Sequence, residues 1–473
     1  MRSTHLLAAI VVLLLFLNLP GELAAQTTAP APAPAVPSGT IGQRAQSALG
    51  LVAFTFLAFA LGRMRGARTI PWRVIVWGIV LQFAFAAVVL FVPRLLETVQ
   101  NAVTALLNYT REGAQMVFGD LALGRGPTVA NDAGQIVGYA QNVGYFAFFV
   151  LPTIIFFSAL TAILYHVGVM QWVVQGLAWV MARTTGTSGA ETLSTAANIF
   201  VGQTEAPLMV RPFIATCTHS ELMVIMVGGF ANIASGVLGL YTFWLEPYIA
   251  NVGGHLAAAC FISAPATLIV GKLLMPETQV PVTGAGVQFK VDKLDANLVD
   301  AAARGTTEGL TLALNVAAML IAFTALVALV NGVIAWTSRQ TGLAAMTGEP
   351  ITLQNLLSYP MAPLAWLCGV SWSDAREVGS LLGIKTVLNE LIAYSVMKDQ
   401  FAANPNFISP RSALIAAYAL CGFANFASIG IQVGGISTLA PQRRADLSRI
   451  ALLAMIGGSI ASFMGACVVG VLL

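Results

Sequence analysis

Charged residues are scarce in this sequence, and so are the side chains on which catalysis and metal binding most often depend. Only 9% of the 473 residues are charged and 57% are hydrophobic, whereas a soluble globular protein has about 25% charged residues. The chain has 4 histidines and contains neither H-E-x-x-H nor G-x-x-x-x-G-K, so the motifs of zinc proteases and P-loop nucleotide hydrolases are missing. A net charge of +3 provides no basic surface for nucleic acid. The composition therefore predicts a chain that mostly faces lipid or other apolar helices.

Cysteines are few as well, and they are scattered. Their number, 5, is odd, and their spacing does not match that of a metal site. We expect them to be small buried hydrophobic residues, and no cofactor is predicted. They are Cys217, Cys260, Cys368, Cys421 and Cys467.

The N-terminal segment differs from the rest of the chain. Arg2 precedes an apolar run at residues 6–17, and small residues follow at Ala24 and Ala25, as in a secretory signal peptide. An uncleaved additional helix is the alternative, because Leu23 is a poor residue for the position three before a cut. Residues 1–25 are thus predicted as a signal peptide and residues 26–40 as an Ala/Pro-rich extended linker.

Eight apolar stretches of the sequence are candidates for crossing a bilayer, which takes about 20 helical residues. The first stretch is short, so its start is expected to lie earlier. The stretches lie at residues 47–62, 72–91, 143–165, 221–245, 253–275, 309–336, 412–436 and 450–473. The sequence predicts an all-α polytopic membrane protein.

Basic residues set the predicted orientation in the membrane. The positive-inside rule puts the loop between the first two stretches in the cytoplasm, because Arg63, Arg65, Arg68 and Arg73 lie in or beside it. The N- and C-termini are then periplasmic, as a signal peptide would require, and the location predicted is the cell inner membrane. The same count places further basic residues inside: Lys290, Lys293, Arg304, Arg443, Arg444 and Arg449.

Two further segments are apolar but interrupted by Gly and Pro, and they do not fit as spans. They lie at residues 185–216 and 360–394, each just before a predicted span. By the topology above, the first opens from the cytoplasm and the second from outside. Both are predicted to be re-entrant hairpins, because non-helical backbone at membrane depth persists only where protein or water surrounds it.

An internal repeat follows the two predicted hairpins. Residues 229–235 (GFANIAS) and 422–428 (GFANFAS) are identical at six of seven positions. The two copies run in opposite directions across the membrane by the count above, and one more span follows each. Such inverted repeats place substrate and ion sites near the midplane, where interrupted helices expose backbone groups.

Each predicted hairpin carries one glutamate at membrane depth, Glu205 in the first and Glu390 in the second. A buried carboxylate is costly unless it is paired, so it indicates a functional site. Two structural alternatives remain: each glutamate caps its own hairpin tip, or it pairs with a nearby base such as Arg211 or Lys385. For Asn232 and Asn425 of the repeat, the alternative is a hydrogen bond between helices.

These motifs resemble the signatures of the concentrative nucleoside transporters, bacterial type. The similarity covers residues 43–473, in the same order and spacing, and it leaves out the signal-like segment and the linker. The motifs are residues 202–208 (GQTEAPL), 389–394 (NELIAY) and 419–426 (ALCGFANF).

The resemblance implies an ion-coupled symporter that carries nucleosides into the cell, and not an enzyme. It implies a homotrimer in which a transport domain moves as an elevator against a scaffold. The scaffold holds the first three spans and the span at 309–336, and the transport domain holds both hairpins and the other spans. The implied division is 41–184 for scaffold helices and interfacial segments, 185–275 for the first repeat, 276–357 for an interfacial segment with a scaffold helix and outer loop, and 358–473 for the second repeat.

The resemblance also assigns site residues. Glu390, Asn425 and Ser428 would hold the ribose hydroxyls, and a carboxylate that accepts such hydroxyls forms strong charge-assisted bonds. The base would be contacted by Gln203, Thr204 and Glu205 and flanked by Val237 and Phe423. Nucleotides are expected to be poor substrates, because no Arg or Lys accompanies these motifs in a phosphate-binding pattern.

The coupling ion is expected to be sodium. The family's sodium site maps to Asn198, Val201, Asn232 and Ile233, with Val201 and Ile233 binding through carbonyl oxygens. Asn232 departs from the pattern, since sodium-coupled relatives usually have Ser or Thr there. Proton-coupled symport, with Glu205 as the proton carrier, is therefore the alternative.

Two other classes of protein remain as rivals. Residues 186–189 (GTSG) match the short motif of rhomboid-type intramembrane serine proteases, but His166, His219 and His255 lie in no matching pattern. A passive channel can also contain two re-entrant hairpins. Purine or pyrimidine preference and coupling stoichiometry do not follow from the sequence.

Overall fold

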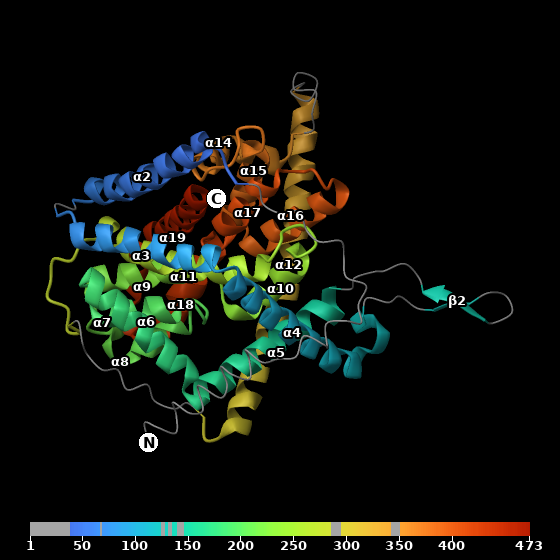
Figure 1. Ribbon diagram of the computed structural model, residues 1–473, viewed down its shortest axis with the longest axis horizontal. Coiled ribbons are helices and arrows are strands. Elements are labelled where there is room, and N and C mark those ends of the chain that lie inside the picture. Colours follow the sequence, from blue (N-terminus) through green and yellow to red (C-terminus); the bar gives the residue numbers. More distant parts are fainter. Residues whose placement is uncertain are drawn as a thin grey trace.

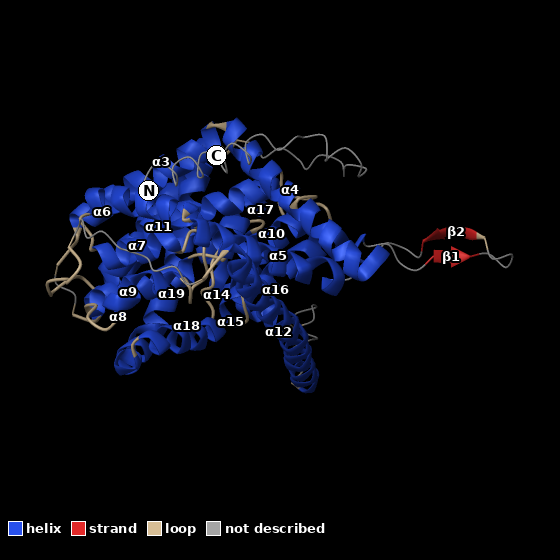
Figure 2. Ribbon diagram, turned by 90° about the horizontal axis from the view of Figure 1, so that it is seen from below, coloured by secondary structure: helices blue, strands red, loops and turns tan. Residues whose placement is uncertain are grey.

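The computed structural model describes residues 38–66, 69–123, 128–130, 135–139, 146–284, 295–341 and 351–473. The predicted signal peptide, most of the predicted linker, and Arg68, Lys290 and Lys293 lie outside the described residues. The described chain is helical (Figure 1), which confirms the all-α prediction, apart from one pair of short antiparallel strands that the sequence did not predict. Those strands, β1 and β2, lie to one side of the helices in Figure 2.

The order of elements is the same as the order of predicted spans and hairpins. The first half comprises α2 (Ile41–Met64), α3 (Trp72–Phe91), α4 (Pro93–Phe118), η2 (Gly119–Leu123), β1 (Thr128–Ala130), β2 (Ile136–Tyr139), α5 (Phe146–Val167), α6 (Val169–Thr185), α7 (Gly189–Ala197), η3 (Ala206–Val210), α8 (Arg211–Ile214), α9 (His219–Ala231), α10 (Ser235–Leu245) and α11 (Val252–Leu274). The second half comprises α12 (Leu298–Gln340), α14 (Leu353–Leu367), α15 (Ala375–Val387), α16 (Glu390–Ala403), α17 (Pro410–Leu420), α18 (Phe426–Leu439), η4 (Pro441–Arg443) and α19 (Arg444–Leu472).

Each of the eight predicted spans falls on helix: on α2, α3, α5, α9 with α10, α11, α12, α17 with α18, and α19. Within the described residues, 5 helical stretches have the length and hydropathy to cross a membrane, and the pair α5–α6, bent by 76°, is a sixth. The bend lies at Gly168, whose φ of 93° suits a residue without a Cβ.

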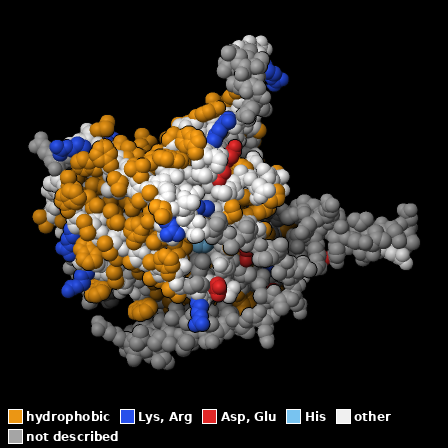
Figure 3. Space-filling view, turned by 45° about the horizontal axis from the view of Figure 1, so that its top comes forward, with side chains coloured by type: hydrophobic (Ala, Val, Ile, Leu, Met, Phe, Trp, Pro, Cys, Tyr) orange, Lys and Arg blue, Asp and Glu red, His pale blue; other side chains and the backbone are white. Residues whose placement is uncertain are grey.

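The spans divide into central and peripheral ones. In the most apolar window of each stretch, 94% of residues are buried for α9–α10, 89% for α11 and 83% for α19, against 33% for α2 and 28% for α3. Large hydrophobic side chains such as Phe56, Trp77 and Val80 are exposed on these two peripheral helices, and Figure 3 shows exposed hydrophobic side chains spread over a broad face. A monomeric soluble protein rarely exposes so wide an apolar face, so α2 and α3 are suited to contact lipid or other apolar helices.

The two hairpins begin at opposite ends of α2. At the start of α3, just after α2 ends, Arg73 donates hydrogen bonds to the carbonyls of Arg183 and Thr184, immediately before hairpin 1. At the other end of α2, Gln46 donates to the carbonyl of Val370 at 2.8 Å, in the turn that leads into hairpin 2. The turns contain Gly186 and Gly369, both with positive φ. The hairpins therefore enter from opposite sides, as the inverted repeat requires.

Hairpin 1, formed by α7 and by η3 with α8, lies within the predicted range 185–216. The predicted range of hairpin 2, 360–394, is wrong at both ends, because that hairpin is α15 and α16. Helix α14 passes through Pro360 and Pro363 without a break. Gly379 marks no interruption either: a Cβ there would lie 2.7 Å from the backbone nitrogen of Ala362, so this glycine permits close packing of α15 on α14.

Both copies of the repeat motif lie where a membrane helix breaks. The backbone is extended at Asn232, between α9 and α10, and at Asn425, between α17 and α18. The two breaks touch: the Phe423 amide donates to the Asn232 carbonyl at 3.3 Å. Ser462 of α19 lies beside both, with Oγ 3.3 Å from the Ala231 carbonyl and 3.1 Å from the Cys421 carbonyl. The Asn232 carbonyl thus finds a main-chain donor inside the protein, and the Ser462 hydroxyl can donate to one of the two carbonyls beside it.

Candidate substrate and ion site

The tip of hairpin 1 is the non-helical turn between α7 and η3. The Glu205 carboxylate accepts a hydrogen bond from the Gly202 amide at 2.8 Å, so the alternative in which Glu205 caps its own hairpin tip is correct for this carboxylate oxygen. Gln203 is buried in the same turn, whereas the Glu205 side chain is exposed. The turn therefore presents an amide toward the protein interior and a carboxylate toward open space.

The open space beside Glu205 is a cavity of about 180 Å³. Its walls come from hairpin 1 and from α5, α6, α10 and α12, and they include Tyr165, Arg304 and Glu308. Arg304 is held by ion pairs to Asp295 at 2.6 Å and to Glu308 at 2.9 Å. Asp295 precedes α12, and the neighbouring Arg304 guanidinium lowers the pKa of its carboxyl group. Acidic and basic groups therefore stand opposite the tip of hairpin 1.

The tip of hairpin 2 presents Glu390 at the first position of α16. Asn389 caps this helix, since its Oδ1 accepts the Ile392 amide at 2.9 Å. A carboxylate in the first turn of a helix interacts favourably with the helix dipole, by about 0.3–1 kcal/mol at exposed sites. The position of Glu390 at the helix N-terminus thus offsets part of the cost of burying a charge at the tip.

The carboxylate of Glu390 is bound by two neutral donors from other helices. The Tyr241 hydroxyl of α10 donates to Oε1 at 3.1 Å, and Nδ2 of Asn425 donates to Oε2 at 3.3 Å. The alternative of an ion pair with Lys385 is not what the structure shows: Lys385 donates to the Ala419 carbonyl at 2.9 Å. Among the described residues, no Lys, Arg or His side chain forms an ion pair with this carboxylate, so it retains capacity to accept further hydrogen bonds.

Hairpin 1 reaches the same helix terminus from the other side. Nε2 of Gln203 lies 3.4 Å from Ser428 Oγ, and Gln432 Nε2 donates to Gln203 Oε1 at 3.2 Å. Asn425 caps α18 by accepting the Ser428 amide at 2.9 Å. The start of α18 therefore connects both hairpin tips, and it joins Gln203 to Glu390 through a continuous chain of polar contacts.

Four of the eight predicted substrate residues belong to this network: Gln203, Glu390, Asn425 and Ser428. Phe423 lies next to it, at the break before α18, and Val237 lies one helical turn before Tyr241 on the same helix face. Thr204 packs against α18 at Gly435, where a Cβ would lie 2.6 Å from its Cγ2. Glu205 is separate from the network and faces the cavity instead.

Tyr241 and Gln432 are network members that the sequence analysis missed. A signal existed for both, because residues three or four apart share a helix face. Tyr241 follows Val237 by four positions, and Gln432 follows Ser428 by four. The contacts themselves join residues 149 and 229 positions apart in the chain, and no local pattern predicts such pairs.

The four predicted sodium ligands lie at corresponding helix ends. Asn198 ends α7 and Asn232 ends α9, each followed by non-helical backbone. Both asparagine side chains are buried, and among the described residues Nδ2 of each has no hydrogen-bond partner. Val201 and Ile233 follow within three positions and can offer main-chain carbonyls. Neutral oxygens of this kind suit a hard cation.

The environment of Asn232 favours an amide orientation with a free oxygen. Ser263 Oγ contacts Asn232 Oδ1, yet it also donates to the Cys260 carbonyl at 3.0 Å. A hydroxyl has one proton, so it cannot donate to both acceptors. Rotating the amide by half a turn lets Nδ2 donate to Ser263 and releases Oδ1, and such flips are assigned from the hydrogen-bond network. Asn232 can therefore supply an oxygen where relatives use a hydroxyl.

The short protease-like motif has a structural explanation. Ser188 is the N-cap of α7, and its hydroxyl donates to Glu221 at 2.5 Å. Two of the histidines have other partners: His255 Nδ1 lies 3.0 Å from the Tyr418 hydroxyl, and His219 Nε2 lies 3.4 Å from Asp446. Ser188 is therefore bound as a capping residue.

An all-α membrane protein whose two re-entrant hairpins meet at paired broken helices has the architecture of a secondary transporter. The chain matches three family models, "Na+ dependent nucleoside transporter N-terminus" over residues 49–121, "Nucleoside recognition" over 147–279 and "Na+ dependent nucleoside transporter C-terminus" over 255–470. The chain belongs to the concentrative nucleoside transporter family.

Relatives with curated names agree with this assignment. The "uncharacterized transporter YutK" of Bacillus subtilis (strain 168) is 40% identical over 428 residues, which covers 89% of this chain and 98% of that protein. "Sodium/nucleoside cotransporter 1" of Mus musculus is 38% identical over 442 residues. This alignment spans 63% of the length of the mouse protein.

Solved structures of CNTnw have the same fold. CNTnw in an inward-facing substrate-bound state is 38% identical to this chain, with a TM-score of 0.76 over 91% of this chain and 97% of that one. A doubly substituted CNTnw variant in an outward-facing state is 36% identical and gives a TM-score of 0.79, covering 91% and 98% of the two chains. These neighbours and the family are transporters, not enzymes.

Proposed function

We propose that this protein imports nucleosides across the cell inner membrane by symport with sodium. The family supports nucleoside transport, and the mouse relative is named a sodium/nucleoside cotransporter. The direction, the membrane and the ion are our inference. A homotrimer with elevator motion and periplasmic termini completes the proposal.

One observation carries the proposal: both hairpin tips converge on the start of α18. Gln203 from hairpin 1 and Glu390 from hairpin 2 contact Ser428 and Asn425 there, at 3.4 and 3.3 Å. A nucleoside is neutral, with an apolar base face, polar base edges and adjacent ribose hydroxyls. Amide groups that both donate and accept match the base edge, and a carboxylate that accepts hydroxyl protons matches the ribose.

The proposed roles follow this division. Glu390, Asn425 and Ser428 bind the ribose, Gln203, Thr204 and Glu205 bind the base, and Val237 and Phe423 flank it. Tyr241 and Gln432 orient members of this set, because they hydrogen-bond to Glu390 and Gln203. When a ligand binds among these residues, hydrogen bonds from the hairpin tips to the start of α18 would be replaced by hydrogen bonds to the ligand.

Sodium is proposed at Asn198, Val201, Asn232 and Ile233. The assignment is supported by the buried Nδ2 atoms of the two asparagines, which have no hydrogen-bond partner among the described residues, because rotating each amide can turn its carbonyl oxygen toward a cation. Proton coupling through Glu205 is the second candidate. It is supported by the position of Glu205, whose side chain faces the cavity and lies apart from the network around Glu390.

Uptake of radiolabelled uridine and adenosine into proteoliposomes tests the proposal. An inward sodium gradient at fixed pH should drive saturable accumulation above the external concentration, and choline in place of sodium should abolish it. Uptake that persists in choline and collapses when a proton gradient is dissipated would shift the coupling role to Glu205. Non-saturable uptake that only equilibrates would indicate a passive channel.

A further inference from the structure

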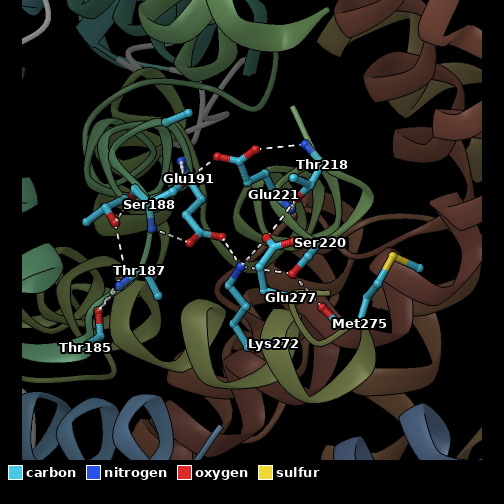
Figure 4. Close-up of polar contacts among 12 residues, drawn as sticks. Thr185, Thr187, Ser188, Glu191, Thr218, Ser220, Glu221, Lys272, Met275 and Glu277 are labelled. Atoms are coloured by element: carbon cyan, nitrogen blue, oxygen red, sulfur yellow. Dashed lines mark hydrogen bonds and ion pairs between the residues drawn. The ribbon is translucent and has the colours of Figure 1, made fainter. Parts of the chain in front are cut away.

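A buried ionic network joins the starts of α7 and α9 (Figure 4). Each helix begins with a capping box, in which a Ser or Thr caps the helix and a Glu three residues on bonds back to it. In α7 the pair is Ser188 and Glu191, and in α9 it is Thr218 and Glu221. The two boxes are linked, because Ser188 Oγ donates to Glu221 Oε1 at 2.5 Å.

Lys272, near the end of α11, neutralises part of this network. Its Nζ lies 2.8 Å from Glu191 Oε2 and 3.3 Å from Glu277 Oε2, and it donates to Ser220 Oγ at 2.9 Å. The Lys272 and Glu191 side chains are 6% and 1% exposed. Burying such charges is costly, and apolar residues of the same volume often serve stability as well or better. The network therefore calls for an explanation other than stability.

The opposite ends of the same two helices carry the proposed sodium ligands. Asn198 follows the last residue of α7, and Asn232 follows the last residue of α9. The helices stay close along their length: a Cβ on Gly228 of α9 would lie 3.1 Å from Asn198 Nδ2 and 3.8 Å from Thr195 Oγ1. Any change in how the helices start would therefore shift their ends relative to each other.

We propose that Lys272 is a positioning residue for the sodium site. By tying Glu191 of α7 to Ser220 at the start of α9, it fixes the relative position of the two helices whose far ends bind the ion. Lys272 does not touch sodium or nucleoside; it acts through the helices. The inference rests on the proposed function, because it takes Asn198 and Asn232 as ligands.

The test compares sodium dependence with nucleoside dependence. Three variants are compared: Lys272→Met, the double variant Lys272→Met with Glu191→Gln (the neutral pair), and Lys398→Met as a control. The neutral pair leaves neither Lys272 nor Glu191 as an unpaired buried charge. Lys398 forms an ion pair with Asp399 whose side chains are 35% and 63% exposed. For each, the half-saturating sodium concentration for uridine uptake and the uridine KM at saturating sodium are measured.

The neutral pair should raise the half-saturating sodium concentration by about tenfold, as loss of groups that orient metal ligands commonly does. Its uridine KM at saturating sodium should stay within about twofold of the parent. Lys272→Met should act in the same direction, and Lys398→Met should change neither value.

Three results would overturn the inference. The neutral pair, purified as a monodisperse protein, could keep the parent's sodium dependence. It could lose sodium and uridine affinity equally, as a generally loosened fold would. Parent uptake that ignores sodium would overturn the proposed function as well, and this third result differs from the other two because it appears in the unsubstituted protein.

Discussion

At the scale of single residues, Glu390 is the main hydrogen-bond acceptor of the proposed site. Glu390 begins α16, and its buried carboxylate accepts hydrogen bonds from two neutral side chains, Tyr241 and Asn425. Helix-terminal dipoles and neutral donors stabilise the negative charge without cancelling it. A ribose hydroxyl pair can therefore replace or join these donors, and a sugar that lacks a hydroxyl leaves an acceptor unpaired.

Replacing Glu390 by Gln is expected to weaken uridine binding by about 1–3 kcal/mol, because a charged acceptor becomes a neutral amide. Discrimination between ribonucleosides and 2′-deoxyribonucleosides should fall at the same time. Both effects are read from KM values for uridine and deoxyuridine. Tyr241→Phe is the matched control: it keeps the charge, removes one donor and should cost less. Normal uridine transport by Glu390→Gln would remove Glu390 from the site.

Gln432 orients Gln203 without a predicted contact to substrate. Replacing Gln432 by Ala removes the hydrogen bond to Gln203 Oε1, so base recognition should weaken by about 0.5–1.5 kcal/mol. The ratio of uridine to adenosine uptake should change, while preference for ribose over deoxyribose should not. Ser437→Ala, on the same helix, serves as the control, since among the described residues its hydroxyl bonds to Gly434 of α18 alone. An unchanged base preference in Gln432→Ala would show that Gln203 is oriented by other groups.

The sequence predicted the site residues that are unusual for their local stretch of chain. It missed the residues that reach the site only through contacts between distant parts of the chain. Glu390 and Glu205 stand out because carboxylates are rare in apolar stretches, and Asn232 and Asn425 because the motif repeats. Tyr241 is an ordinary residue for an apolar helix, and only the fold brings it to Glu390. Closeness in sequence also did not predict an ion pair. Lys385 is five positions from Glu390, but its ammonium group donates to the Ala419 carbonyl.

At the scale of elements, the paired breaks in two helices decide where the site lies. Gly422 sits at the point of closest approach, with φ of 153° and space so limited that a Cβ would lie 2.8 Å from the carbonyl oxygens of Ala231 and Phe230. These backbone atoms cannot move aside to make room for a Cβ, as the end of a flexible side chain could. The contact holds the break before α18 against the break after α9, and with it Asn425 against Asn232.

Substituting Gly422 by Ala is therefore expected to destabilise the fold by about 1–3 kcal/mol. The apparent Tm in detergent should fall, and uridine uptake should fall with it. Gly430→Ala is the control, because a Cβ at Gly430 meets no atom within 4 Å. An alanine inside a helix is favoured over glycine by roughly 0.5–1 kcal/mol, so this control should keep or slightly raise Tm. Equal behaviour of the two variants would mean that the breaks do not meet as closely as described.

The boundaries of helices and hairpins are predicted well by local sequence patterns in some places and poorly in others. The predicted span at 72–91 coincides with α3, because lipid exposure leaves a plain hydrophobic run. The predicted range of hairpin 2 began too early because proline normally ends a helix, whereas α14 contains both Pro360 and Pro363. Gly379 and Gly383 looked like breaks, although they permit α15 to approach α14 closely. Glycine has both meanings, and only the packing distinguishes them.

At the scale of the whole molecule, contacts fix which ends lie together. The Gly39 amide, just before α2, donates to the Leu473 carbonyl at 2.6 Å. The other end of α2, at Gly62, approaches the end of α11 near Leu273. The start of α2 and the end of α19 therefore lie together, at the end of α2 opposite to its arginine-rich end. The positive-inside rule predicts that this arginine-rich end faces the cytoplasm, which would leave the start of α2 and the end of α19 on the periplasmic side.

Single cysteines at Arg65 and Gln340 test this orientation. Both residues are exposed, and the 5 native cysteines, all buried, would be replaced first. A membrane-impermeant thiol reagent should reach position 65 only from the cytoplasm and position 340 only from the periplasm. Labelling of both positions from one face would contradict the orientation and the number of spans between them.

The central claim is that both hairpin tips form one nucleoside site at the start of α18. A structure of the protein with uridine and sodium tests it most directly. The account predicts the ribose hydroxyls within hydrogen-bonding distance of Glu390 and Asn425, and the base edge at Gln203. Uridine bound only in the cavity beside Glu205 and Arg304, with the contacts of Glu390 to Tyr241 and Asn425 intact and no ribose nearby, would contradict it.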